Sequence, residues 1–176
     1  MRLIGLLLCL SLVACEEKAA EPAPADFEQR ADAATKRFAR ELQAALKGAI
    51  AEGGPEHAIG LCKHMAPQIT SNHTKDGLRL RRIGVRVRNH KTNVPTDAER
   101  VAMMKLTKGA PTTVATLDGR RKFLRAIYVG SPVCLHCHGT DIQPAVKEKL
   151  DELYPEDEAI GLSLGDLRGA FVVEAM

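Results

Sequence analysis

The stretch Thr112–Val129, TTVATLDGRRKFLRAIYV, decides the fold of this chain of 176 residues. Two runs within it, Thr112–Leu117 and Lys122–Val129, are rich in apolar and β-branched residues, and Asp118-Gly119 lies between them. Asp-Gly is typical of the tight turn of a β-hairpin, because that turn needs residues that accept a positive φ. The stretch therefore predicts two neighbouring antiparallel strands.

Strand patterns also lie on both sides of this hairpin. In the segment Leu78–Arg88, Ile83, Val85 and Val87 alternate with arginine and glycine, which predicts a half-buried strand. The segment Arg168–Glu174 predicts the last strand of the chain. Together these segments predict a small antiparallel sheet.

Helical patterns dominate the first part of the chain. Apolar residues recur every three or four positions between residues 26 and 52, which predicts an amphipathic helix that ends at Gly53-Gly54. Pro55 suits the first turn of a second helix. The apolar face of this second helix carries Ala58, Cys62, Met65, Ala66 and Ile69.

Two shorter helices are predicted farther along. The capping box Thr96-x-x-Glu99 begins a third helix. Its predicted core face comprises Val101, Met104 and Leu106. A fourth helix carries Val146, Leu150 and Leu153. Because helices come first and strands follow, we expect the α+β class and not a doubly wound α/β sheet.

The composition narrows the class of protein. The length suits one domain, and 45% of the residues are apolar, yet the chain has no Trp, two Tyr and four Phe. Its core is therefore either aliphatic or encloses a flat group that the gene does not encode. The net charge of +3 is too small for the clustered basic face of a nucleic-acid-binding protein. The sequence has no run of 18 apolar residues, so we expect no transmembrane helix.

The N-terminus predicts export and lipid anchoring. Residues 1–14, MRLIGLLLCLSLVA, read as a secretory signal peptide, and Leu12-Val13-Ala14-Cys15 resembles the box at which bacterial lipoproteins are cleaved and lipidated. Residues 15–25 predict a lipidated Cys15 with a flexible tether, and a single domain then spans 26–176. We expect a lipid-anchored periplasmic protein, at the outer membrane and not the inner one, because Glu16 and not Asp follows the cysteine. The alternatives are an ordinary signal peptide with a chance cysteine and a buried apolar first helix.

The cysteines indicate a cofactor. Of five, Cys9 leaves with the signal peptide and Cys15 carries the lipid. The others are Cys62, Cys134 and Cys137. The motif Cys134-Leu135-His136-Cys137-His138 is C-x-x-C-H, which attaches haem c through two thiols and offers His138 as an axial ligand of the iron. A thioredoxin-like disulfide would need a βαβ context, and a zinc site would need a second ligand pair.

Cys62 is left without a partner by this assignment. It is either a small buried apolar residue or the second axial ligand of the iron, and its place on the apolar face of the second helix fits both. Other candidate ligands are His64 and Met65 on the same helix and Met103 or Met104 on the third. An open sixth position is a further alternative.

Six spaced segments, from the second helix to the end of the chain, carry a resemblance to a known family. They are Ala58-Ile59-Gly60-Leu61-Cys62 with Ala66-Pro67, Arg86-Val87-Arg88-Asn89, Asn93-Val94-Pro95 leading to Glu99, Cys134-Leu135-His136-Cys137-His138-Gly139, Tyr154-Pro155-x-Asp157-x-Ala159-x-Gly161, and Gly165-Asp166-Leu167-Arg168-Gly169-Ala170-Phe171. The chain resembles the exported c-type haem proteins with a PAS-like α+β fold. The resemblance implies a six-coordinate haem with His138 and Cys62 as axial ligands. Where that family usually has Arg-Asn-Pro, Asn89 is followed here by His90, which becomes a minor alternative ligand.

Arginines cluster near the predicted first strand. They are Arg79, Arg81, Arg82, Arg86 and Arg88. Guanidinium groups bind carboxylates through paired hydrogen bonds, so we expect this cluster, Arg86 and Arg88 above all, to contact the haem propionates. The alternative is an ordinary solvated strand face.

These features predict a membrane-tethered, periplasmic mono-haem c-type cytochrome that acts in low-potential electron transfer or redox response with a separate partner protein. A thiolate ligand donates charge to iron and favours the ferric state, which lowers the potential. The alternative function is a haem-based sensor of NO or CO that works with a separate partner. We expect no enzymatic activity, because a peroxidase or reductase needs an open iron position and an acid–base group beside it.

Overall fold

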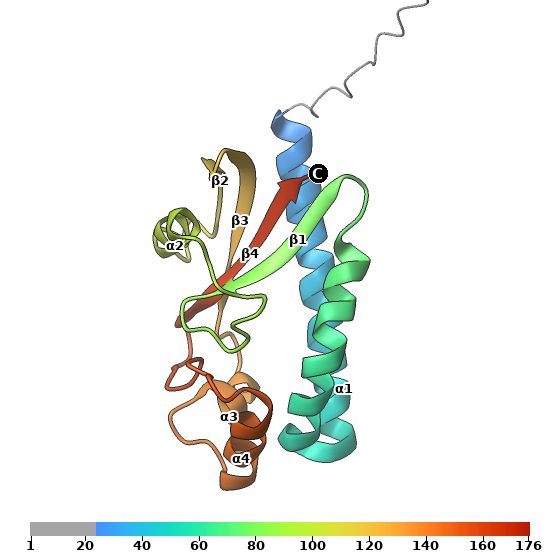
Figure 1. Cartoon of the computed structure of the whole chain (residues 1–176), viewed down its shortest axis with the longest axis vertical. Coiled ribbons are helices and arrows are strands. Elements are labelled where there is room, and N and C mark those ends of the chain that lie inside the picture. The colour runs from blue at the N-terminus through green and yellow to red at the C-terminus, as the bar shows by residue number, and fades with distance from the viewer. Residues whose placement is uncertain (1–23) are drawn as a thin grey trace, which may run out of the picture.

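The computed structural model describes residues 24–176. The predicted signal peptide, Cys15 and most of the predicted tether lie outside these residues. The elements in chain order are α1 (Pro24–His73), β1 (Leu78–Gly84), α2 (Asp97–Met104), β2 (Thr112–Leu117), β3 (Arg120–Tyr128), the 3₁₀ helix η1 (Pro132–Cys134), α3 (Leu135–His138), α4 (Pro144–Leu153) and β4 (Leu167–Ala175). Figure 1 shows α1 on one side of the sheet, α2 on the other, and α3 and α4 beyond one end of it.

The element α1 is a pair of antiparallel helical segments. Gly53 and Gly54 leave the helical conformation, and Gly54 has a φ of 77°, which glycine adopts without a steric penalty. The chain reverses there, so the segments 24–52 and 55–73 lie side by side (Figure 1). Across the pair, the rings of Phe38 and His73 meet edge to face at 5.6 Å. The two helices predicted on either side of the glycine pair are confirmed.

The four strands form one antiparallel sheet in the order β1-β4-β3-β2. The predicted hairpin is present, and both Asp118 and Gly119 have positive φ, as a two-residue hairpin turn requires. The α+β class, with long N-terminal helices and a small antiparallel sheet, is therefore confirmed. The strand predicted over Leu78–Arg88 is shorter than expected, because pairing with β4 ends at Gly84 opposite Gly169.

Each face of the sheet has its own core. The face toward α1 buries Leu78, Leu80, Phe123, Phe171 and Val173 with residues of α1. The face toward α2 buries Ile83, Met103, Leu106, Leu124, Ala170 and Val172.

The predicted core face of the third helix is wrong in two positions. Met103 is fully buried, whereas Val101 and Met104 are each 57% exposed. The capping box at Thr96 is present, and Glu99 is also buried, one helical turn before Met103. Residues four apart share a helix face, so the buried side follows Glu99 and Met103 and turns Val101 and Met104 outward.

The aromatic residues are unevenly distributed. All four Phe residues are buried with the core between α1 and the sheet. A third apolar cluster joins the second segment of α1 to α4 through Ile59, Val146 and Leu150, and the one aromatic residue packed against it is Tyr154. The end of the molecule that carries the C-x-x-C-H motif is thus the end that Phe does not fill.

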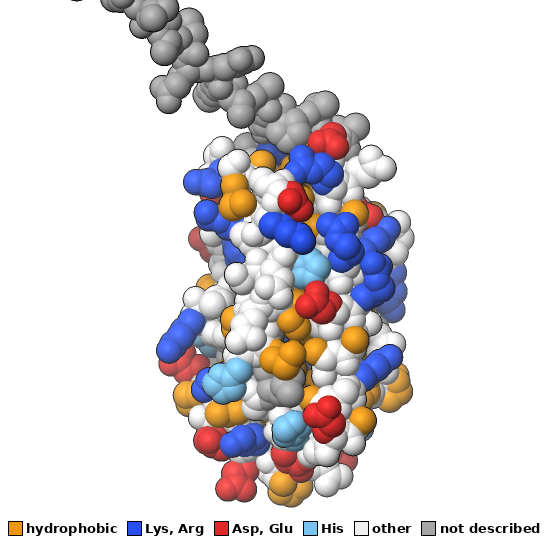
Figure 2. Space-filling model, turned by 90° about the vertical axis from the view of Figure 1, so that its right-hand side faces the viewer, with side chains coloured by type: hydrophobic (Ala, Val, Ile, Leu, Met, Phe, Trp, Pro, Cys, Tyr) orange, Lys and Arg blue, Asp and Glu red, His pale blue; other side chains and the backbone are white. Residues whose placement is uncertain are grey.

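The surface on the α1 side also differs between the two ends of the molecule. Figure 2, which views the α1 side, shows most of its Lys and Arg side chains toward the end where α1 begins, and apolar side chains grouped toward the other end. Within residues 24–176, no helix combines the length and the apolar content needed to cross a membrane.

Candidate functional site

The C-x-x-C-H motif folds as a tight helical turn. Cys134 is the last residue of η1 and Cys137 lies in α3, three residues later, so both thiols lie on one side of the turn. Gly139 ends the turn, and a Cβ atom there would lie 2.6 Å from the backbone oxygen of Leu135. Only glycine lets the chain pass this close, which keeps the turn compact.

The imidazole of His138 is held from one side. Its Nδ1 lies 2.6 Å from the backbone oxygen of Ala159, which can only accept, so Nδ1 carries the proton. Burial, with repulsion from Arg88 and Arg168, lowers the pKa of His138 well below its usual range, although the bond to Ala159 opposes this. The ring is therefore neutral at neutral pH with Nε2 as its lone-pair atom, the form in which histidine binds a metal.

Backbone hydrogen bonds hold the segment 157–162 against the turn formed by the C-x-x-C-H motif. Gly161 N donates to the oxygen of Gly139 at 2.9 Å, and Leu162 N donates to the oxygen of His138 at 2.8 Å. Asp157 Oδ1 accepts from Ala159 N at 2.8 Å. These bonds fix the position of the carbonyl that orients His138.

Arg88 joins three parts of this arrangement. Its Nε donates to Asp157 Oδ2 at 2.9 Å, and its Nη2 donates to the backbone oxygen of Cys137 at 2.5 Å. Both partners of the ion pair are largely buried, a setting in which a bonded charge pair fixes geometry. Arg88 therefore holds the loop and the motif together through its own donors.

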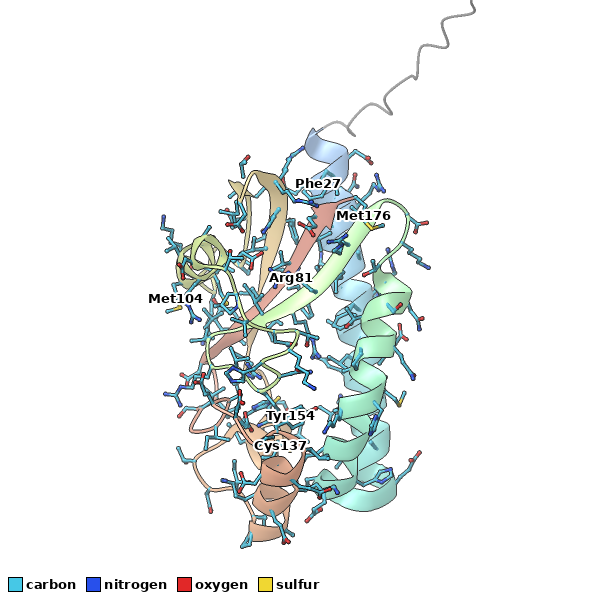
Figure 3. All side chains as sticks on the ribbon, in the orientation of Figure 1. Phe27, Arg81, Met104, Cys137, Tyr154 and Met176 are labelled. Atoms are coloured by element: carbon cyan, nitrogen blue, oxygen red, sulfur yellow. The ribbon has the colours of Figure 1, made fainter. Side chains whose placement is uncertain are left out.

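Cys62 lies on the second segment of α1, across from this turn. The neighbouring Ile59 packs in the cluster that also contains Cys137 and Tyr154, and Lys63 Nζ donates to the backbone oxygen of Leu153 at 3.1 Å. Figure 3 shows Cys137 and Tyr154 close together at the α3–α4 end of the molecule. The structure thus brings the helix that carries Cys62 against the elements that carry the haem motif.

The thiols share one electrostatic environment. Burial raises the pKa of Cys62, and Arg82 and Arg88 act in the opposite direction. Burial also raises the pKa of Cys137. The charge of Arg88 lowers this pKa, and a negative charge on Cys62 would raise it further. Cys62, Cys134 and Cys137 are all free thiols, available for attachment or ligation.

The alternative ligands lie in other settings. His64 is exposed, Met65 packs against the core between α1 and the sheet, and Met103 is buried under α2 on the opposite face of the sheet. Met104 is largely exposed. His90 keeps a buried Nε2 with no hydrogen-bond partner among the described residues, so it remains an alternative.

The arginines differ in how far their donors are occupied. Arg86 is exposed and donates to the backbone oxygen of Ile160 at 2.6 Å. Two others are Arg168, whose Nη1 donates to the backbone oxygen of Arg86 at 2.9 Å, and Arg82, whose guanidinium lies 5.7 Å from the Phe38 ring. The charges of both lower the pKa of His138. Arg82 belongs to the arginine cluster that the sequence offered for the propionates, and Arg168 stands in one of the segments that carry the family resemblance.

Two comparisons with known proteins found a match, one to a family and one to a solved structure. The family described as Tll0287-like matches residues 16–175. The crystal structure of the cyanobacterial heme-protein Tll0287 is similar to this chain with a TM-score of 0.66 and 22% identity, over 86% of this chain and 95% of that one. Among curated proteins no match is found. At this level of identity the structural match establishes a shared fold.

Proposed function

The chain belongs to the Tll0287-like family, and from this premise we propose that it is a membrane-tethered, periplasmic mono-haem c-type cytochrome for low-potential electron transfer or redox response. The observation that carries the proposal is the orientation of His138, whose Nδ1 is bonded to the oxygen of Ala159 while Nε2 remains a ligand atom. We also propose that the antiparallel sheet with its flanking helices is a PAS-like fold and that this fold positions His138 as a ligand.

The donor set suits a covalently bound haem. Cys134 and Cys137 would each add S–H across one vinyl double bond, which forms a C–S bond and needs no other reactant. His138 Nε2 and Cys62 Sγ would be the axial ligands. Their elements already pack together through the cluster of Ile59, Val146 and Leu150.

The distribution of aromatic residues supports the same assignment. All four Phe residues lie in the core between α1 and the sheet, and the cluster beside the haem motif is aliphatic apart from Tyr154. A large flat apolar group suits the end that lacks Phe.

When bound, the haem supplies a reversible one-electron carrier. Two protein ligands would leave no open position for a substrate, which favours electron transfer over catalysis. Cys62, as a thiolate, would add negative charge at the iron and stabilise the ferric state, which lowers the potential. Arg88 and Asp157 would keep His138 in place in both oxidation states through the carbonyl of Ala159.

The proposed tether places the site away from the membrane. Cleavage after residue 14 and lipidation of Cys15 would anchor the chain just before α1, at the outer membrane in our proposal. The 29 residues of the first segment of α1 (24–52) span about 43 Å at 1.5 Å per residue. Because the haem motif lies at the far end (Figure 1), it would face a soluble redox partner in the periplasm.

Spectroscopy of the holoprotein tests the iron ligands. We expect the ferric protein to show a low-spin, thiolate-ligated signal by electron paramagnetic resonance and absorption, and the variant Cys62→Ala to lose it. The matched control is His64→Ala, two residues farther on the same helix and exposed, which should leave the spectrum unchanged. An unchanged spectrum in Cys62→Ala would refute this ligand.

Two further outcomes separate the alternatives. Rapid binding of CO or NO by the wild-type ferrous protein would favour the haem-based sensor. A high-spin wild type that reacts with peroxide would favour an enzyme. For the anchor, mass spectrometry of the mature protein should find a lipidated Cys15, and an unmodified N-terminus downstream of it would contradict lipidation.

A further inference from the structure

Arg82 is a partly buried cation whose donors have no hydrogen-bond partner among the residues that the structure describes. It lies on β1 opposite Phe171 of β4, with its guanidinium 5.7 Å from the ring of Phe38. Among residues 24–176 it makes no ion pair and no hydrogen bond, and its nitrogens are not among the fully enclosed polar atoms that lack partners. Its donors therefore open onto accessible space.

Arg82 interacts electrostatically with three groups of the candidate site. Burial lowers the pKa of Arg82, and charges on Cys62 and Tyr154 act against this. Arg82 in turn acts on the pKa of His138. The guanidinium therefore shares the electrostatic environment of both proposed axial ligands and of Tyr154, on the face of β1 that is turned toward Phe38 of α1.

Arg168 repeats this situation from β4. It donates from Nη1 to the backbone oxygen of Arg86 at 2.9 Å, and within the described part of the chain it pairs with no carboxylate. Burial and repulsion from Arg88 and Arg82 lower the pKa of Arg168 to about 10. A cation in such a place needs a negative partner, because burial of an unpaired charge is costly.

The charges around the site do not balance. Arg82, Arg88 and Arg168 contribute three positive charges, and two carboxylates act on groups of the site, Asp157 on Arg168 and Glu56 on Cys137. Asp157 is already paired with Arg88. Among residues 24–176, neither Arg82 nor Arg168 forms an ion pair with a carboxylate.

We propose that Arg82 and Arg168 bind the two propionate carboxylates of the haem, with Arg82 as the principal contact. Guanidinium groups with open donors bind carboxylates through paired, charge-assisted hydrogen bonds, and two carboxylates match the two unpaired cations. The sequence suggested Arg88 for this role, but Arg88 donates hydrogen bonds to Asp157 and to the backbone oxygen of Cys137. Arg86 is exposed and donates to the backbone oxygen of Ile160. The assignment rests on the proposed haem site.

The test compares charge-removing and charge-keeping variants of the haem-loaded protein. The variants are Arg82→Gln, Arg168→Gln and Arg82→Lys. The matched control is Arg79→Gln on the same strand, where Arg79 pairs with Glu174 on the face turned away from α1. For each variant we would measure bound haem by mass, the reduction potential, and the resonance Raman bending band of the propionates, which reports hydrogen bonds to these carboxylates.

Removal of a positive charge beside the haem favours the ferric state. We expect Arg82→Gln to shift the redox equilibrium about tenfold toward it, which is about 59 mV for a one-electron couple. The propionate band should move in this variant, Arg168→Gln should show a smaller shift, and Arg82→Lys should recover most of the potential. Arg79→Gln should match the wild type.

The outcomes separate this assignment from the haem site itself. A haem-loaded Arg82→Gln with wild-type potential and propionate band would overturn the assignment and leave the haem site intact. If Arg82→Gln carries no haem, the assignment stands when Arg82→Lys is loaded and fails when it is not. A wild type without covalent haem would instead overturn the proposed function.

Discussion

The Nδ1 atom of His138 donates to the backbone oxygen of Ala159 across 21 residues of sequence, at 2.6 Å. The position of this oxygen depends on Asp157, which accepts from Ala159 N and from Arg88 Nε. The orientation of the proposed iron ligand is therefore set by a loop, which backbone hydrogen bonds and one buried ion pair hold in place.

Asp157→Asn should weaken binding of the haem iron by His138, although Asp157 is not itself a proposed ligand. The amide cannot pair with Arg88 as a carboxylate does, so the loop should loosen and His138 should bind less firmly. Substitution of such supporting partners commonly costs 10–100-fold in metal affinity, an effect of about 10-fold or more here. Titration of the ferrous protein with CO should show easier displacement of a ligand. The control Glu156→Gln, at an exposed neighbouring position, should behave as wild type, and equal CO binding in both variants would contradict this role for Asp157.

Loss of the haem should unfold one end of the molecule before the other. The four Phe residues support the core between α1 and the sheet, whereas the cluster around Val146 and Leu150 lacks them. In the double variant Cys134→Ser/Cys137→Ser we expect hydrogen exchange to stay slow in β3 and β4 and to become fast in α4. The exposed His136→Ala should keep both the haem and the protection. An α4 equally protected in the double variant would show that its aliphatic packing is sufficient.

Local patterns predicted the elements that local interactions determine. The Asp118-Gly119 turn, the capping box at Thr96 and the reversal at Gly53-Gly54 each depend on a few neighbouring residues. The C-x-x-C-H motif was also found from local spacing, and its role in attaching haem stays a prediction.

Features that depend on distant partners were not predicted in full. The strand from Leu78 ends early because its partner β4 stops pairing at Gly169, which no property of β1 reveals. For a similar reason the sequence could not separate Arg82 from Arg86 and Arg88 within the arginine cluster. Only the fold shows that Arg88 is bonded to Asp157, whereas Arg82 makes no ion pair with any residue of the part that the structure describes.

The buried face of α2 gives a direct test of this difference. Met103 is fully buried and Met104 is 57% exposed, although the two are neighbours in sequence. Met103→Ala should destabilise the protein by about 2–5 kcal/mol through lost packing and a cavity. Met104→Ala should change stability by less than about 0.5 kcal/mol. Urea unfolding of the two variants measures this, and equal losses would place the helix in the orientation that the sequence pattern predicted.

The orientation of α2 is set by a charge network centred on Glu99. Its Oε1 accepts from Lys122 Nζ at 2.7 Å, and its Oε2 accepts from Arg81 and from the backbone N of Thr96. Burial alone would raise the pKa of Glu99, but the hydrogen bonds from Lys122 and Arg81 outweigh it and hold the pKa below its usual value.

Glu99→Gln should therefore lower stability and alter its dependence on acid. A buried ion pair that loses one partner costs about 3 kcal/mol or more, because the remaining charge is left unpaired. A carboxylate with a depressed pKa contributes stability that is fully present above its unfolded value, about 4.3, and is lost as the pH falls through the folded value. Urea unfolding between pH 7 and 3 should show the wild type losing more stability on acidification than Glu99→Gln. The exposed Glu28→Gln should follow the wild-type curve, and parallel curves for Glu99→Gln and the wild type would show that Glu99 carries no such linkage.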